Sequence, residues 1–260
     1  MYTNPVAVLD FASLYPSVVC AYNLCYSTCL GKVPDERDLR NLEVRDGNTS
    51  HKTPNQIAGL GGGPPRKLGC FDLALPAGLL PALVGMDGGK PTGTTTPTSV
   101  TVTPNGVMFA KPKIRQGILP RLLTEILDTR VMVKSVLKRC ALSGDPGSKP
   151  RRRALTAKQT GLKLIANVTY GYTAAGFSGR MPMAELADAI VQCGRETLER
   201  AIRTVHAGDK RWDGARVVYG DTDSLFVEFP GYTRAQAFDA AACIARVVTA
   251  GHPDPGNLNL

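Results

Sequence analysis

One short hairpin signal restricts the fold of this 260-residue chain more than any other stretch. Residues 219–224 read Tyr-Gly-Asp-Thr-Asp-Ser and separate two apolar, β-type runs at 215–219 and 225–227, which predicts an antiparallel hairpin. Asp221 and Asp223 are two positions apart, so near a strand end their side chains can project to the same face. Two neighbouring carboxylates repel each other unless a cation lies between them, and their oxygens suit Mg²⁺. An ordinary turn is the alternative, because glycine and aspartate are common turn residues.

A second strand that ends in an aspartate lies near the start of the chain. The run 6–11, Val-Ala-Val-Leu-Asp-Phe, predicts a buried strand that ends at Asp10. Residues 13–17 then turn the chain into a short helix that reaches about residue 21, and Pro16 is tolerated in its first turn. An aspartate at this position is also typical of a helix cap. Asp10 is informative only together with the hairpin, because strand ends that carry carboxylates can share a divalent cation.

The net charge of +9 is concentrated in one part of the chain. Between Lys111 and Lys163 there are 14 lysine and arginine residues against 3 acidic residues, a local net charge of +11, so the remaining residues sum to −2. A basic segment of this density indicates a polyanionic partner such as nucleic acid or nucleotide phosphates. For single residues, a solvated helical face and a basic loop at 149–153 remain the alternative.

Apolar periodicity predicts several longer helices, at about 118–142, 155–170, 181–205 and 233–251. The expected apolar stripe of the first consists of Leu122, Ile126, Leu127, Val133 and Leu137. A short polar stretch joins the first two helices, so they are expected to form an antiparallel hairpin with one basic flank. Lys163 and Asn167 share a face of the second helix. We assign no chemistry to the third helix, and a capping box of Thr233 and Gln236 is expected to start the last one.

The remaining segments predict short strands and insertions. Residues 100–102 and 107–109 flank a Pro-Asn-Gly turn and predict a second hairpin. Runs rich in glycine and proline at 59–65 and 88–98 predict flexible insertions. The order of the elements favours an α+β fold: a small antiparallel sheet backed by helices, with the helical hairpin as a protruding insertion.

The composition excludes several classes of protein. There is no run of about 18 apolar residues and no charged-then-apolar leader, so we expect neither a membrane partner nor secretion. The 7 cysteines are an odd number and form no Cys-x-x-Cys pair. This argues against a disulfide framework, a zinc site or an iron–sulfur cluster, and it favours a reducing compartment.

Together, the strand-end carboxylates and the basic helical hairpin match the needs of phosphoryl transfer. Two metal ions about 3.5–4 Å apart activate the attacking oxygen and stabilise the leaving oxygen in such reactions. Cationic side chains neutralise the triphosphate, for which Arg130, Lys134 and Lys163 of the helical hairpin are the candidates.

Three segments of the sequence resemble the family B DNA polymerases. Residues 10–17, Asp-Phe-Ala-Ser-Leu-Tyr-Pro-Ser, are similar to motif A of that family. Residues 163–171, Lys-Leu-Ile-Ala-Asn-Val-Thr-Tyr-Gly, are similar to motif B, and residues 219–224 to motif C. Three motifs in the family order make the resemblance specific. It covers nearly the whole chain, apart from about 33–69 and 88–98.

Within the family, the chain resembles the zeta branch, which performs translesion synthesis. The segments 129–134, Thr-Arg-Val-Met-Val-Lys, and 177–182, Phe-Ser-Gly-Arg-Met-Pro, are similar to that branch. Val168 stands where the family usually has serine, and the zeta branch is similar to this chain there. The resemblance implies a nuclear DNA-directed DNA polymerase. A replicative family B polymerase is the near alternative, and a non-catalytic remnant and a plain nucleic-acid-binding module are the others. Intact Asp10 and Asp223 disfavour the remnant.

The resemblance implies roles for single residues at the metal site. Asp10 and Asp223 would bridge two Mg²⁺ ions, with Asp221 as a supporting catalytic acid and the backbone carbonyl of Phe11 as a further ligand. The residues implied to contact DNA are Tyr219, Gly220 and Thr222.

The resemblance also implies a nucleotide site. The residues that would contact the incoming deoxynucleoside triphosphate are Ser13, Leu14, Tyr15, Arg130, Lys134, Lys163, Asn167 and Tyr170. Tyr15 would lie under the deoxyribose as a steric gate against a 2′-hydroxyl, and Tyr170 would line the nascent base pair. Ordinary core packing of the two tyrosines, and a helix-packing hydrogen bond from Asn167, are the alternatives.

By the same resemblance, residues 1–110 form the first part of a palm, 111–172 the fingers and 173–260 the second part of the palm. The thumb and the exonuclease domain of such enzymes are absent, so the chain resembles a palm-and-fingers fragment or a truncated gene product. The expected partners are primer–template DNA and deoxynucleoside triphosphates, with accessory polymerase subunits bound by the missing regions. Because the thumb holds the duplex in these enzymes, we expect the fragment alone to extend primers negligibly.

Overall fold

A computed structural model describes residues 2–32, 86–87, 90–91, 100–142, 148–175, 181–252 and 260 of the chain. They form a mixed α/β fold with small antiparallel sheets, which agrees with the expected fold class at this level. The chain divides into two compact units. The first comprises Met1–Tyr22, Leu119–Tyr170 and Ile190–Leu260, and the second Asn23–Ile118 and Gly171–Ala189. No helix among the described residues is long and apolar enough to cross a membrane.

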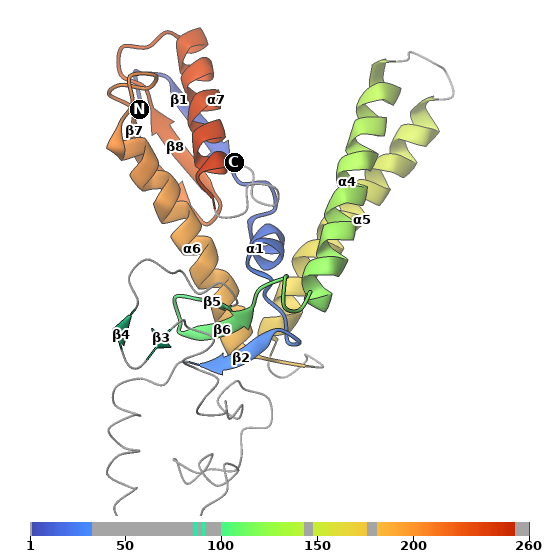
Figure 1. Cartoon of the computed structure of the whole chain (residues 1–260). Coiled ribbons are helices and arrows are strands. Elements are labelled where there is room, and N and C mark those ends of the chain that lie inside the picture. The colour runs from blue at the N-terminus through green and yellow to red at the C-terminus, as the bar shows by residue number, and fades with distance from the viewer. Residues whose placement is uncertain are drawn as a thin grey trace, which may run out of the picture. The chain divides into compact units, whose positions relative to one another are not determined.

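The first unit contains a three-stranded antiparallel sheet that carries the expected hairpin (Figure 1). Its strands, in spatial order, are β1 (Val6–Asp10), β8 (Ser224–Glu228) and β7 (Arg216–Asp221). Ser224 of β8 lies opposite Asp10 on one side and opposite Asp221 on the other. The hairpin turn contains Thr222, whose φ of 47° is a left-handed conformation that a β-branched residue rarely adopts. The sheet therefore brings the end of β1 next to this turn.

The first unit also contains three helices besides the helical hairpin. They are α1 (Leu14–Tyr22), α6 (Ala184–Ala207), whose residues from Ile190 belong to this unit, and α7 (Arg234–Ala250), which packs against β1. The buried face of α7 consists of Ala237, Ala240, Ala241, Ile244 and Val248. These residues are mostly alanines, so the helix can pack closely against β1. The expected capping box is present: Thr233 accepts from the backbone N–H of Gln236, and the Gln236 side chain accepts from that of Thr233.

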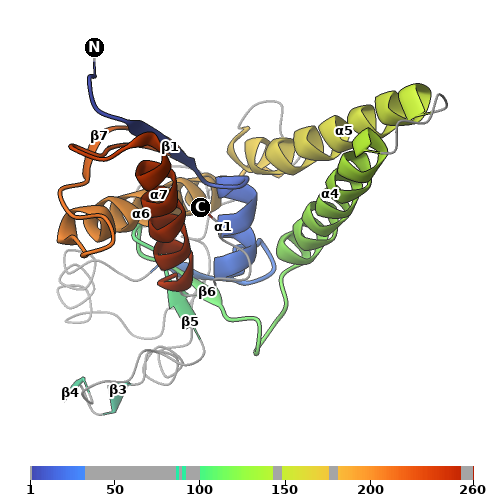
Figure 2. The same ribbon diagram turned by 90° about the horizontal axis from the view of Figure 1, so that it is seen from above.

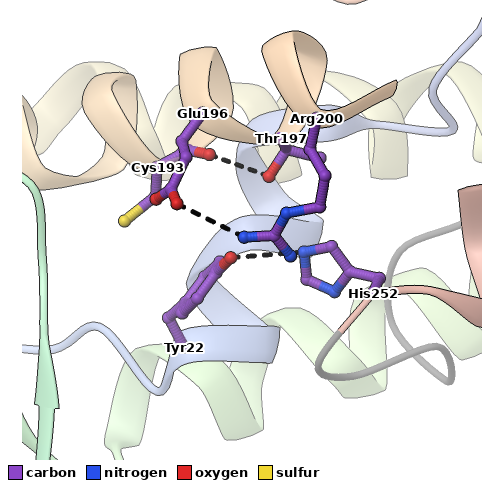
Figure 3. Close-up of polar contacts among 6 residues, drawn as sticks. All are labelled: Tyr22, Cys193, Glu196, Thr197, Arg200 and His252. Atoms are coloured by element: carbon purple, nitrogen blue, oxygen red, sulfur yellow. Dashed lines mark hydrogen bonds and ion pairs between the residues drawn. The ribbon is translucent and has the colours of Figure 1, made fainter. Parts of the chain in front are cut away.

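A half-buried group of polar side chains joins α1, α6 and the residues after α7 (Figure 3). The Tyr22 hydroxyl lies 3.3 Å from Nε2 of His252. On α6, Arg200 donates to Glu196 at 3.3 Å, and its guanidinium points toward the Tyr22 and His252 pair. Burial raises the pKa of Tyr22, and the nearby Arg200 charge opposes that shift. Contacts between such distant parts of the chain fix α1, and with it the turn that follows β1.

Two long helices form the expected helical hairpin (Figures 1 and 2). They are α4 (Ile118–Leu142), which has the predicted bounds, and α5 (Ser148–Ala174). The start of α4 is held against α1, because Cys20 donates to the carbonyl of Pro120 and accepts from Thr124, each at 3.5 Å. The prediction that Leu122 belongs to the apolar stripe is wrong. Leu122 is 44% exposed, whereas Leu123 is 1% exposed.

The second helix of the hairpin starts earlier than the sequence pattern predicted. α5 begins at Ser148 and not near residue 155, so residues 149–153 are helical and the alternative of a basic loop there does not hold. Arginine is a good helix former, and Pro150 lies in the first turn, where its missing N–H has no partner to lose. The Lys149 and Arg151–Arg153 side chains are exposed.

The second unit contains a separate antiparallel sheet. Its strands, in spatial order, are β2 (Cys29–Lys32), β6 (Val107–Ala110) and β5 (Val100–Val102), so the predicted second hairpin is present. Buried Asn23 organises the neighbouring turns by donating to the carbonyls of Ala110 and Arg115 and accepting from Gly117 N–H. Two short strands, β3 (Met86–Asp87) and β4 (Lys90–Pro91), pair with each other. Part of the predicted 88–98 insertion therefore lies in a strand. The predicted 59–65 insertion lies outside the described residues.

Candidate active site

A cavity of about 590 Å³ in the first unit collects most of the side chains that the sequence singled out. The turn after β1, the two helices of the hairpin and the turn between β7 and β8 provide its lining. The lining residues are Asp10, Phe11, Ala12, Ser13, Leu14, Tyr15, Pro16, Arg130, Lys134, Lys163, Asn167, Tyr170 and Asp223. All residues implied to contact the nucleotide, and all three implied metal ligands, therefore border one space. Their individual roles stay predictions.

Two carboxylates, Asp10 and Asp223, line the cavity. Asp10 is the last residue of β1, and Asp223 lies in the turn beside it, where its carbonyl accepts a 2.8 Å hydrogen bond from the N–H of Phe11. Burial raises the pKa of the Asp223 carboxyl, and the nearby charges of Asp10 and Asp221 raise it further. The folded chain thus holds like charges close together at a cost that a bound cation would relieve.

The two carboxylates and the neighbouring backbone of Phe11 fit a magnesium ion. Among the described residues no three histidine, cysteine, aspartate or glutamate side chains group in a way that could hold a metal ion. Mg²⁺ commonly binds through one or two carboxylates together with water and substrate phosphates, not through a full protein cage. Asp10, Asp223 and the backbone of Phe11 are the residues that would hold it.

Three cations, Arg130, Lys134 and Lys163, line the same cavity. Arg130 Nη1 donates to Ser13 Oγ at 2.8 Å, whereas its buried Nε has no hydrogen-bond partner in the described part of the chain. The pKa of Lys134 is lowered, first by partial burial and then by the positive charges around it, which include Arg130 and Lys163. Crowded cations and an unpartnered buried donor both indicate an anionic ligand.

Two stacked tyrosines form one wall. The rings of Tyr15, from α1, and Tyr170, from α5, have centroids 4.7 Å apart and planes 22° apart. Burial raises the pKa of Tyr15, and the neighbouring Tyr170 and Asp223 raise it as well, so the phenol stays neutral at physiological pH. Asn167 lies one helical turn before Tyr170 on the same cavity-lining face of α5. The tyrosines are thus part of the cavity lining, and their roles stay predictions.

Sequence reasoning missed Gly194 on α6, the helix to which it assigned no chemistry. A Cβ atom at Gly194 would lie 3.2 Å from Cε1 of the Tyr15 ring and 3.6 Å from Leu14. The absence of a side chain therefore lets α6 support the back of Tyr15. An isolated glycine inside a helical pattern was the available signal, because it usually has a packing or functional reason.

We expect Gly194→Ala to weaken triphosphate binding about fivefold or more, since overpacking of about 1–3 kcal/mol would displace the Tyr15 ring. The melting temperature should fall little, because alanine raises helix propensity by about 1 kcal/mol and offsets part of the strain. A fluorescent dATP analogue in an anisotropy titration measures the affinity.

Gly161→Ala on α5 is the matched control, because its Cβ would meet nothing within 4 Å. It should leave the affinity unchanged. If Gly194→Ala binds the nucleotide as tightly as the original chain, Gly194 has no role in positioning Tyr15.

Four of the predicted residues lie outside the cavity lining. Asp221 is exposed, and its carboxylate accepts a hydrogen bond from the Thr222 hydroxyl. Its backbone carbonyl accepts from the N–H of Asp223, and its charge contributes to the raised pKa of Asp223. Tyr219 is 56% exposed and packs edge-on against Phe226. Gly220 and Thr222 are exposed as well. Asp10 and Asp223 both line the cavity and Asp221 does not, whereas Asp10 and Asp221 both act on the Asp223 carboxyl as neighbouring charges.

Comparison with known proteins relates the chain to one family. The family model described as DNA polymerase family B matches residues 1–259. The DNA polymerase zeta catalytic subunit of Arabidopsis thaliana is 47% identical over 259 residues, which cover 100% of this chain and 11% of that protein. The zeta catalytic subunit of Saccharomyces cerevisiae is 43% identical over 254 residues, 98% of this chain and 14% of that protein. The DNA polymerase delta catalytic subunit of Oryza sativa subsp. japonica is 34% identical over 232 residues, 88% of this chain and 15% of that protein. The chain spans about a tenth of the length of the Arabidopsis relative.

Proposed function

Because the chain belongs to DNA polymerase family B, we propose that it carries the catalytic centre of a DNA-directed DNA polymerase of the zeta type. In this reaction the 3′-hydroxyl of a primer attacks the α-phosphorus of a deoxynucleoside triphosphate, a phosphodiester bond forms, and pyrophosphate leaves. The template strand selects the nucleotide by base pairing.

The observation that carries this proposal is that carboxylates and cations line one cavity. Asp10 and Asp223 are the carboxylates, and Arg130, Lys134 and Lys163 are the cations. The pKa of Asp223 is raised and the pKa of Lys134 is lowered, in each case first by burial and then by the like charges nearby, so each group is held at a cost. A magnesium–triphosphate complex carries both complementary charges, so it relieves both repulsions at once.

The side chains of the cavity support a positioning mechanism. Arg130, Lys134 and Lys163 neutralise the β- and γ-phosphates, so that the triphosphate lies with its α-phosphorus toward the carboxylates. Tyr15 supports the sugar, and its ring excludes a 2′-hydroxyl. Asp10 and Asp223, with the backbone of Phe11, would hold two Mg²⁺ ions, which when bound would supply Lewis-acid activation of the attacking hydroxyl and charge stabilisation of the leaving oxygen.

The finer assignment is part of the proposal. The sheet that carries Asp10 and Asp223 corresponds to a polymerase palm, and the α4–α5 hairpin to the fingers. Primer–template DNA and deoxynucleoside triphosphates are the substrates, accessory subunits bind other regions of the full-length protein, and the nucleus is its compartment. The higher identity to zeta than to delta subunits supports the translesion type over the replicative alternative.

A chimaera tests the proposal in a full-length polymerase. The matching 254-residue segment of the S. cerevisiae zeta catalytic subunit is replaced by this chain. The chimaera is expected to extend a primer with Mg²⁺, and Asp10→Asn should lower the rate roughly 100-fold or more, because an essential charge partner of the transition state is lost.

Asp239→Asn, an exposed position on α7, is the matched control and should leave the rate unchanged. A soluble, assembled chimaera that does not extend primers would contradict the polymerase assignment. Extension that stops at template lesions bypassed by the yeast parent would favour the replicative alternative.

A further inference from the structure

A cluster of exposed cations lies where α4 ends and α5 begins. Its members, the basic tip, are Lys138 and Arg139 of α4 with Lys149, Arg151, Arg152 and Arg153 of α5. None of them lines the active-site cavity. Arg152 precedes Lys163 by about three helical turns, or roughly 17 Å along the axis of α5. A triphosphate in the cavity therefore cannot account for the cations that α5 contributes to the tip.

The basic tip lowers the stability of the helical hairpin. Four of its cations occupy the first turns of α5, where the positive end of the helix dipole repels them, and no acidic residue lies in the first turn. No described acidic residue forms an ion pair with any member of the tip. Arg151, Arg152 and Arg153 also repel one another. A surface that combines these costs is stabilised when a polyanion binds to it.

The chemistry of the tip indicates which part of a polyanion it contacts. Residues 138–153 contain no aromatic side chain on which a base could stack, and no asparagine or glutamine that could read a base edge. Arginine and lysine side chains on a convex helical end instead suit phosphate oxygens, which position nucleic acid without reading its sequence.

We propose that the basic tip binds the phosphodiester backbone of DNA at a site separate from the catalytic cavity. This site holds the nucleic acid near the enzyme by sequence-independent contacts. The choice of DNA as the polyanion rests on the proposed polymerase function, whereas the presence of a phosphate-binding surface rests on the charges alone.

The test compares the 260-residue chain with its Arg151→Gln/Arg152→Gln/Arg153→Gln variant. Fluorescence anisotropy measures the affinity for a labelled single-stranded oligonucleotide and for a labelled blunt duplex between 50 and 200 mM salt. The variant should bind roughly tenfold or more weakly at the lowest salt, and the slope of log affinity against log salt should fall by about 2, because each lost phosphate contact removes about 0.7–0.9 from it.

Two readouts separate this role from a structural one. The melting temperature of the variant should not fall, because the lost cations opposed the helix dipole. Its affinity for a Mg²⁺-bound dATP analogue should not change, so failure of the DNA site is distinguishable from failure of the proposed catalytic centre. The matched control, Arg195→Gln/Arg203→Gln/Arg246→Gln, removes the same charge from exposed positions of α6 and α7.

The outcomes distinguish single-stranded from double-stranded DNA as the source of the phosphodiester backbone. Weaker binding of the single strand alone assigns the tip to a template overhang, and weaker binding of the duplex alone assigns it to double-stranded DNA. A loss for both supports a general backbone contact. If the tip variant and the control lose the same affinity and slope for both forms, the proposal is overturned.

Discussion

The double variant Asp10→Asn/Asp223→Asn is expected to bind a deoxynucleoside triphosphate equally well with and without Mg²⁺. The unchanged chain should bind it at least about tenfold more tightly when Mg²⁺ is present, since the carboxylates and the phosphates then share the ion. Without Mg²⁺ the order of the two affinities reverses. The variant should bind more tightly than the original chain, because two anions that repel the phosphates are gone.

Anisotropy of a labelled dATP analogue, titrated with Mg²⁺ and with EDTA, measures both affinities. Asp213→Asn/Asp239→Asn is the matched control, because it makes the same charge change at exposed positions and should keep the full Mg²⁺ effect. An undiminished Mg²⁺ effect in the Asp10 and Asp223 variant would remove these residues from the metal site. A misfolded variant is recognised by loss of the metal-free binding as well.

Lys163→Ala should weaken triphosphate binding about 10- to 100-fold, because a charge-assisted contact to a phosphate is worth roughly 1.5–3 kcal/mol. The loss should shrink as salt is added, since the lost term is electrostatic. Deoxyadenosine, which lacks phosphates, should bind the variant and the original chain alike. Competition against the labelled analogue measures both ligands.

Lys158→Ala, on the same helix but outside the cavity lining, is the control and should leave triphosphate affinity unchanged. Equal losses for the two lysine variants would mean that Lys163 acts only through the general charge of α5. Equal losses of affinity for deoxyadenosine and for the triphosphate would mean that Lys163 contacts the sugar or the base.

Local patterns were sufficient to predict the elements that carry the site. Asp10 lies at a strand end as its apolar run predicted, and α4 has the bounds that its periodicity indicated. The same holds for the hairpin around Asp223 and for the capping box at Thr233. These features depend on contacts between residues a few positions apart, so the alternation, the turn chemistry and the caps can be read along the chain. Resemblance to family motifs then supplied the residues that line the cavity.

The tertiary structure alone decided which side chains meet. It separated Asp223, which lines the cavity, from Asp221, which does not, and it placed Gly194 behind Tyr15. It also buried Leu123 in place of Leu122. Each outcome depends on the packing of elements far apart in sequence, and a 3.6-residue period specifies a helical face only to within about one neighbouring position. The local pattern contains the chemistry of each residue, whereas long-range packing determines its partners.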